Sequence, residues 1–203
     1  MRIAVVDYGM GNIRSVSKAL ERVAPRAEVL VTSDANAIRN AERVVVPGQG
    51  AMPDCMRQLA ASGAREAVVE AAGAKPFLGV CIGLQMLFER GEEGDTPGLG
   101  LLPGRVPRLK VSGLKIPHMG WNELFPRAAH PVLEGLPAGT HAYFVHSFEL
   151  RPTEPTDILA ETDYGGPIVA AVGRDNLFGT QFHPDKSQQA GLRLIANFLR
   201  WRP

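Results

Sequence analysis

The sequence predicts an α/β fold built on a mixed, mostly parallel sheet that is flanked by helices. Short β-branched runs alternate with amphipathic segments through the first half of the chain, as in parallel βαβ units. The second half is richer in proline and glycine, and its shorter apolar runs indicate antiparallel strands and loops. With 203 residues and no evident linker or repeat, residues 1–203 are expected to form a single domain.

The first half supplies four predicted strands, each a short run of β-branched or large apolar residues: Ile3 to Val6, Val29 to Thr32, Val44 to Val46 and Phe77 to Val80. Helices are predicted between them. One runs from about Ile13 to Val23, and the alanine-rich stretch from Asp54 to Ala72 holds two short helices divided near Gly63. Another is predicted after the fourth strand, because Leu84, Leu87 and Phe88 recur at helical spacing until Gly91.

The second half changes character between Thr96 and Thr156, where prolines and glycines are frequent. Strands are predicted at Ala142 to Val145, Ile158 to Glu161, Ile168 to Val172 and Leu177 to Gln181. A closing helix from Ser187 to Trp201 places Leu192, Ile195, Ala196 and Leu199 on one face.

Charge and cysteine content exclude several classes of protein. The chain has 22 basic and 21 acidic residues, so it offers no broad basic surface to nucleic acid or to an anionic membrane. The apolar opening reaches Asp7 too soon for a signal peptide, and no apolar stretch is long enough to span a bilayer, so we expect a cytoplasmic protein. Two cysteines without a CxxC motif predict neither a disulfide framework nor a metal site.

Cys81 is the candidate nucleophile. It lies in Gly79-Val80-Cys81-Ile82-Gly83, where a predicted strand meets a helix. This is the cysteine analogue of the nucleophile elbow, in which flanking glycines permit a sharp turn that exposes the central side chain at the edge of the sheet. The first helical N–H groups favour a thiolate there. Cys55, between Met52 and Met56, is expected to be a packing residue.

His183 is the candidate base. It follows the strand that ends near Gln181, at the sheet edge where α/β proteins place their sites. Asp185 is two residues further on and could hold the other ring nitrogen, which would complete a Cys-His-acid triad. Without Cys81, a surface His-Pro turn would be the preferred interpretation of this segment.

The segments Gly79-Val80-Cys81-Ile82-Gly83-Leu84-Gln85 and Gln181-Phe182-His183-Pro184-Asp185 resemble the triad signature of class I glutamine amidotransferases. Within that class, other segments resemble the glutaminase subunits of imidazole glycerol phosphate synthase, in order from about residue 2 to residue 201. These segments are Asp7-Tyr8-Gly9-Met10-Gly11-Asn12-Ile13, Pro47-Gly48-Gln49-Gly50, Pro117-His118-Met119-Gly120-Trp121-Asn122 and Tyr143-Phe144-Val145-His146-Ser147-Phe148.

The resemblance implies a flavodoxin-like domain that hydrolyses glutamine to glutamate and ammonia without a cofactor or metal. Cys81 would attack the side-chain carboxamide, His183 would carry the proton and Asp185 would orient His183. The oxyanion would be stabilised by the backbone N–H of Ile82 and by an N–H of the segment Gly48, Gln49 and Gly50. Glutamine would be held by Gln85, by Glu93 or its neighbour Glu92, and by the strand around Ser147.

The resemblance also implies a partner. The ammonia would pass to a separate (β/α)₈-barrel cyclase subunit that makes imidazole glycerol phosphate and aminoimidazole carboxamide ribonucleotide in histidine biosynthesis. The resulting heterodimer has a chemical rationale, because free ammonia is mostly protonated at neutral pH and is then not nucleophilic. Residues expected at the partner interface are Gly9, Gly11, Asn12, Trp121, Tyr143 and Lys186.

Two residues depart from the family pattern, and they bear on the catalytic rate more than on the identity of the protein. The family usually has Glu where this chain has Asp185, and Val where it has Gln49. Because Asp is one methylene shorter, its hydrogen bond to His183 is expected to lengthen. The alternatives are the glutaminase subunit of another synthase, such as pyridoxal phosphate synthase, a catalytically weakened binding subunit, and a cysteine-elbow hydrolase or chaperone. A dinucleotide site after the first strand is disfavoured, because Arg14 replaces the third glycine.

Overall fold

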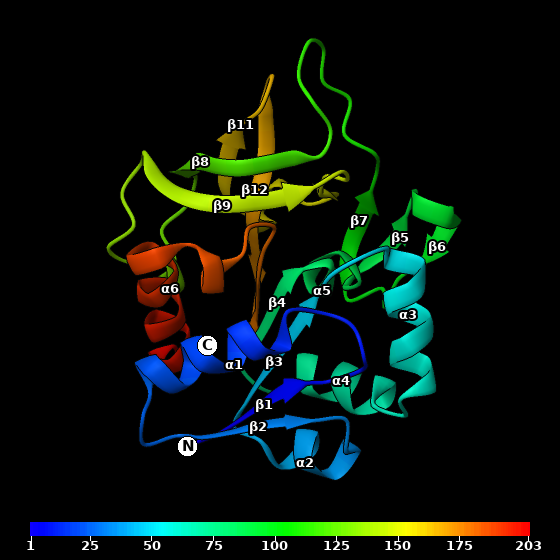
Figure 1. Cartoon of the computed structure of the whole chain (residues 1–203), viewed down its shortest axis with the longest axis vertical. Coiled ribbons are helices and arrows are strands. Elements are labelled where there is room, and N and C mark those ends of the chain that lie inside the picture. The colour runs from blue at the N-terminus through cyan, green and yellow to red at the C-terminus, as the bar shows by residue number, and fades with distance from the viewer.

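The computed structural model describes residues 1–203 and has a nine-stranded sheet as its frame (Figure 1). Along the sheet, the strands are β2 (Glu28–Thr32), β1 (Arg2–Val6), β3 (Arg43–Gly48), β4 (Phe77–Cys81), β13 (Leu177–Thr180), β12 (Pro167–Arg174), β11 (Ile158–Asp163), β8 (His118–Pro126) and β9 (Thr140–His146). The pairings from β2 to β13 are parallel and those from β13 to β9 are antiparallel. The predicted mixed sheet is therefore confirmed.

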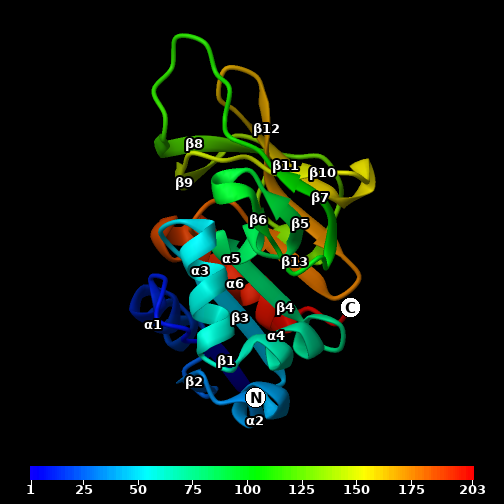
Figure 2. The ribbon, with the colours of Figure 1, turned by 90° about the vertical axis from the view of Figure 1, so that its right-hand side faces the viewer.

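Helices cover both faces of the parallel part. The helices α1 (Ile13–Val23) and α6 (Gln188–Arg200) pack against each other, whereas α2 (Ala35–Asn40) packs against α4 (Arg65–Ala72). Figure 2 shows α3 (Met52–Ala61) and α4 in front of the strands, with α6 behind them. The strands β3 and β4 are buried along their whole length, which explains their continuous apolar sequence.

The prediction of a helix that runs to Gly91 is wrong. The helix α5 spans only Ile82–Gln85, and Phe88–Gly91 forms strand β5 of a second, four-stranded sheet. Its other strands are β6 (Thr96–Pro97), β7 (Leu102–Val106) and β10 (Arg151–Pro152). The carbonyl of Leu87 accepts from the N–H groups of Leu101 and Leu102. The apolar residues after α5 are therefore buried by pairing with a distant segment, which periodicity alone does not reveal.

Most other predicted elements are present with shifted ends. The break near Gly63 does separate α3 from α4, and the closing helix is α6. The sequence analysis did not predict α2, which Asp34 caps by accepting from the Ala37 N–H at 2.7 Å. It also did not assign a strand to β8, a nine-residue strand that pairs with β9. None of the helices is both long and apolar enough to cross a bilayer.

Candidate active site

Cys81 sits in a strained turn at the carboxyl end of β4. Its φ of 55° and ψ of −113° lie in a region that a residue with a Cβ rarely adopts. The flanking glycines are required, because a Cβ on Gly83 would lie 1.9 Å from the Val46 carbonyl oxygen and one on Gly79 would lie 2.9 Å from the Leu84 Cα. The predicted elbow geometry is thus confirmed.

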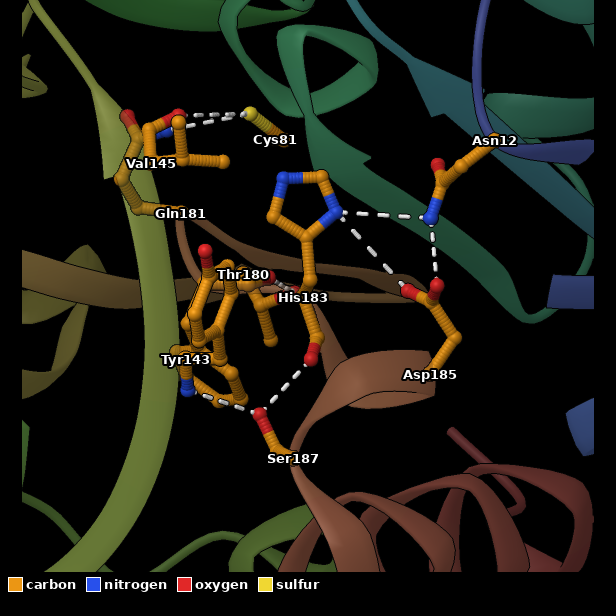
Figure 3. A network of polar contacts seen from close by, with 10 residues as sticks. Asn12, Cys81, Tyr143, Val145, Thr180, Gln181, His183, Asp185 and Ser187 are labelled. Carbon is orange, nitrogen blue, oxygen red and sulfur yellow. Dashed lines mark hydrogen bonds and ion pairs between the residues drawn. The ribbon is translucent and has the colours of Figure 1, made fainter. Parts of the chain in front are cut away.

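His183 reaches the same edge of the sheet from the neighbouring strand. Because β4 and β13 are paired in parallel, their carboxyl ends meet, and His183 follows the end of β13. Its backbone is fixed to β9: its N–H donates to the Tyr143 carbonyl at 2.9 Å, and its own carbonyl accepts from the Ser187 hydroxyl at 2.7 Å. Figure 3 shows the imidazole between Cys81 on one side and Asn12 and Asp185 on the other.

Asp185 and His183 are close but not in direct hydrogen-bond contact. The distance from His183 Nδ1 to Asp185 Oδ1 is 3.8 Å. The Asn12 amide nitrogen lies beside both, at 2.5 Å from Asp185 Oδ2, to which it donates, and at 3.5 Å from His183 Nδ1 (Figure 3). The expected lengthening of the acid–imidazole contact is confirmed. The sequence analysis placed Asn12 at the partner face and missed its contact with this pair.

Burial sets the protonation of the candidate nucleophile and the candidate base. It raises the pKa of the Cys81 thiol to about 12, against the weaker opposing effect of the Ile82 N–H, and it lowers the pKa of His183 to about 4. The pair is therefore a thiol and a neutral imidazole, and the expectation of a thiolate is wrong because burial outweighs the helical N–H. The Nε2 atom of His183 has no hydrogen-bond partner. That nitrogen is available to accept a proton.

A cavity of about 370 Å³ opens beside the thiol and the imidazole. Most of the predicted site residues line it: Gln49, Gly50, Cys81, Ile82, Gln85, Glu93, Ser147 and His183. Gly48 is adjacent, since it is in register with Cys81 in the β3–β4 pair. The Gln85 side chain donates to the Gln181 amide oxygen at 2.9 Å, and its own amide oxygen is buried without a partner.

The cavity carries two side chains of opposite formal charge. Glu93 lines it, and its carboxylate also accepts from the Met52 N–H at 2.8 Å. Glu92 does not line it and instead accepts from the Arg108 N–H at 2.6 Å. Arg108 is the second charged residue, and its guanidinium lies 5.9 Å from the centre of the Phe148 ring. The sequence analysis missed Arg108, because nothing in the local pattern distinguishes it from a surface arginine.

Hydrogen bonds from two side chains anchor the segment from Pro47 to Gly50. The Tyr8 hydroxyl donates to the Pro47 carbonyl at 2.8 Å, and the Cys55 thiol donates to the Gln49 carbonyl at 3.4 Å. Cys55 is fully buried, as expected of a packing residue. It has in addition a polar contact with the segment predicted to hold the oxyanion.

Three residues predicted at the partner face, Trp121, Tyr143 and Lys186, lie side by side. Trp121 on β8 packs edge to face against Tyr143 on β9, with 5.9 Å between the ring centres. The Lys186 ammonium nitrogen lies 5.8 Å from the centre of the Tyr143 ring. Trp121 is 46% exposed. Gly9 and Gly11 lie in the loop before α1, and a Cβ on Gly11 would come within 3.4 Å of the Pro47–Gly48 peptide. Contact of any of them with a partner remains a prediction.

A sequence model of the family described as "Glutamine amidotransferase class-I" matches residues 4–201. Solved structures agree in fold. A structure titled "Crystal structure of glutamine amidotransferase" aligns with a TM-score of 0.74 at 21% identity, covering 98% of this chain and 97% of its own. Another, titled "Structure of PurLQS from Thermotoga maritima", aligns with a TM-score of 0.74 at 20% identity, with the same coverage of 98% and 97%. The fold and the site define a class I glutamine amidotransferase.

Curated relatives narrow the class. The imidazole glycerol phosphate synthase subunits HisH of Aromatoleum aromaticum and Nitrosomonas europaea are each 56% identical, over 99% of this chain and 99% of their own length. The HisH subunit of Rhodospirillum rubrum is 53% identical over 100% of both chains. The chain belongs to the HisH family of imidazole glycerol phosphate synthase subunits.

Proposed function

We propose that Cys81, His183 and Asp185 carry out the glutamine hydrolysis of this family, and that the ammonia passes to a cyclase subunit. The observation that carries the assignment is the meeting of a strained cysteine elbow and an unpartnered imidazole nitrogen in one cavity. The pyridoxal phosphate synthase alternative is disfavoured by the full-length identity to HisH proteins.

The reaction begins with proton transfer. The Cys81 thiol gives its proton to His183 Nε2 as the sulfur attacks the side-chain carbonyl carbon of glutamine. The tetrahedral intermediate collapses to a thioester when His183 returns the proton to the departing amine, which leaves as ammonia. His183 then takes a proton from water, the hydroxide attacks the thioester, and glutamate and the free thiol are released.

Asp185 and Asn12 orient the base in this scheme. A carboxylate on the Nδ1 side of His183 favours the tautomer with hydrogen on Nδ1, which leaves Nε2 as the acceptor for the thiol proton. The Asn12 amide fixes the carboxylate through its 2.5 Å hydrogen bond. Negative charge on the tetrahedral oxygen is stabilised by the Ile82 N–H and by an N–H of the Gly48–Gly50 segment.

The charges of the cavity match a zwitterionic amino acid. The Glu93 carboxylate is placed to bind the α-ammonium group of glutamine, and Arg108 its α-carboxylate. Gln85 has an unpartnered amide oxygen toward which the substrate carboxamide can donate. Ser147 supplies a further polar group on the same wall.

We further propose that residues 1–203 work as one domain, because one sheet joins both halves of the chain and the family match spans residues 4–201. That the ammonia acceptor is another chain is supported by the curated relatives, which are named as one subunit of a synthase. Trp121, Tyr143 and Lys186, with the loop of Gly9, Gly11 and Asn12, form the proposed docking face for a (β/α)₈-barrel cyclase. A cytoplasmic location is proposed as well, supported by two cysteines that form no disulfide.

The decisive experiment follows the amide nitrogen. The chain is combined with the cyclase and its ribonucleotide substrate, and supplied with glutamine labelled with ¹⁵N in the side-chain amide. We expect the label in the imidazole ring of imidazole glycerol phosphate. Labelled ammonia that is released without entering that product contradicts the proposal.

A further inference from the structure

Two buried histidines outside the triad connect β8 to the wall of the cavity. His118 and His146 face each other in the β8–β9 pair, and they are 2% and 4% exposed. His118 is stacked between Phe144 and Tyr164, with ring centres 4.7 Å and 4.0 Å away. The mechanism above uses neither histidine.

The hydrogen-bond direction along these residues is set at Asn122. Its amide oxygen accepts from the Glu123 N–H at 2.8 Å, and its amide nitrogen donates to the Asp163 carbonyl at 2.8 Å. Turning the amide over would break both bonds, so the nitrogen faces His118. It lies 3.1 Å from His118 Nε2, which must therefore accept.

The remaining links follow from that first one. With Nε2 of His118 accepting, the hydrogen of the neutral ring is on Nδ1 and is donated to His146 Nε2 at 2.9 Å. His146 in turn donates from Nδ1 to the Phe148 carbonyl at 2.7 Å. A proton added to either ring would place two donors face to face. In agreement, burial lowers the pKa of both histidines to about 4.

The chain of bonds ends at the cavity. His146, Ser147 and Phe148 are consecutive lining residues, and the Phe148 carbonyl is the last acceptor. The backbone around them is also tied to the Arg108 segment, since the Leu109 N–H donates to the Ser147 carbonyl at 2.9 Å. The cavity wall formed by residues 146–148 is therefore held by the imidazoles of His118 and His146 as well as by regular sheet pairing.

We propose that Asn122, His118 and His146 are positioning residues that hold the 146–148 wall for glutamine through one directed chain of hydrogen bonds. The proposal rests on glutamine binding in this cavity. It also links the pocket to β8, whose opposite face carries the exposed residues Met119 and Trp121. Loss of a link is expected to weaken substrate binding more than the chemical step, because none of the three side chains hydrogen-bonds to Cys81 or to His183.

The kinetic test compares three variants in the complex with the cyclase. His118→Phe keeps an aromatic ring between Phe144 and Tyr164 but leaves His146 Nε2 without a donor, so KM for glutamine should rise about tenfold with kcat within about twofold. His118→Asn places an amide nitrogen near the position of Nδ1 and should restore most of the affinity. His130→Phe is the matched control, because His130 also stacks on an aromatic ring but lies outside the cavity; it should leave KM unchanged.

A second test examines the bonds themselves. Histidine ¹⁵N spectra of the wild-type chain at pH 7 should show His118 and His146 neutral with hydrogen on Nδ1, whereas free imidazole side chains favour hydrogen on Nε2. A cationic ring, or hydrogen on Nε2 in either residue, overturns the chain. An unchanged KM in His118→Phe, or an equal rise in the His130→Phe control, overturns its role. If the wild-type complex releases no glutamate from glutamine, the proposed function fails instead, and the spectra still decide the direction of the bonds.

Discussion

At the residue scale, burial makes Cys81 a thiol that ionises only as it reacts. The pKa of Cys81 is raised to about 12 and that of His183 lowered to about 4, so a stable thiolate–imidazolium pair is disfavoured. The strained backbone at Cys81 places the residue at the cavity. Proton transfer and attack are thus expected to be coupled to the arrival of glutamine.

Cys81→Ser should abolish glutamine hydrolysis, with a loss of at least about a thousandfold, while the fold and partner binding persist. His183 is too weak a base to activate a hydroxyl there. Cys55→Ser is the control, because a serine hydroxyl can still donate to the Gln49 carbonyl and most activity should remain. Glutamate release measures both. Loss of turnover in the Cys55 variant with retention in the Cys81 variant would reverse the assignment.

Asp185→Glu should match or exceed the native rate. The longer side chain can close the 3.8 Å separation from His183 that aspartate leaves. Asp185→Ala should reduce kcat, but by less than His183→Ala, since an orienting group contributes less than the base itself. The three rates are compared at saturating glutamine. A large loss in Asp185→Glu with the fold intact would show that the site is built around the shorter acid and Asn12.

The two charges of the cavity can be tested with substrate analogues. Arg108→Met should raise KM for glutamine by about tenfold or more, but should change little with glutaminamide, which lacks the α-carboxylate. Glu93→Gln should also raise KM for glutamine, but it should change KM little for glutaramate, which lacks the α-ammonium group. Hydrolysis of the side-chain amide measures all combinations. Equal effects of Arg108→Met on both substrates would place Arg108 away from the carboxylate.

At the scale of elements, the site depends on one close approach between β3 and the start of α5. Gly83 lies against the Val46 carbonyl and Gly48 against the Ile82–Gly83 peptide, with no room for a Cβ in either place. This contact brings the Gly48–Gly50 segment to the N-terminus of the helix that follows Cys81. The two backbone sources of oxyanion stabilisation are thereby neighbours.

Gly83→Ala should push the start of α5 away from β3. The added Cβ would overlap the Val46 oxygen, so we expect a stability loss of about 3 kcal/mol and nearly complete loss of glutaminase activity. Gly73→Ala is the matched control. A Cβ there meets nothing nearer than 3.8 Å, and the variant should be as stable as the native chain or more so. Urea unfolding and glutamate release measure the outcome, and similar behaviour of the two variants would contradict the argument.

At the scale of the whole molecule, the site lies between the parallel and antiparallel parts of one sheet. The parallel part supplies Cys81 and His183, and the antiparallel β9 supplies the opposite wall of the cavity. The docking face proposed for the cyclase includes residues from both parts. A partner bound there would contact elements that border the cavity on two sides.

Activity should therefore depend on the partner. Tyr8 and Cys55 hold the carbonyls of Pro47 and Gln49, whereas no side chain holds the Gly48 carbonyl, so we expect the Gly48–Gln49 peptide to be the one that rotates. Supplying a missing oxyanion donor corresponds to about a hundred- to a thousandfold in rate. Glutamate release should rise in that range from the chain alone to the complex with cyclase and its ribonucleotide ligand. Equal rates in both states would contradict this switch.

Local patterns were sufficient for the elements that act through their immediate neighbours. The glycines of Gly79 to Gly83 predicted the elbow, and the position of His183 after a strand placed the proposed base at the same edge of the sheet. Local patterns failed where pairing with a distant segment decides the structure. Phe88 to Gly91 is a strand because Leu102 to Val106 pairs with it, and the Arg108 side chain reaches the cavity only through the pairing of its segment with Phe148.

The mixed α/β architecture, the cysteine elbow and the family resemblance could be read from local residue patterns, because each depends on residue types at short, fixed spacings. The tertiary structure decided which side chains complete the site. Asn12 meets Asp185 across 173 positions of the chain, and Gln85 meets Gln181 across 96. Such contacts follow from how strands order themselves in the sheet, and that order is set by the packing of the whole core rather than by any local pattern.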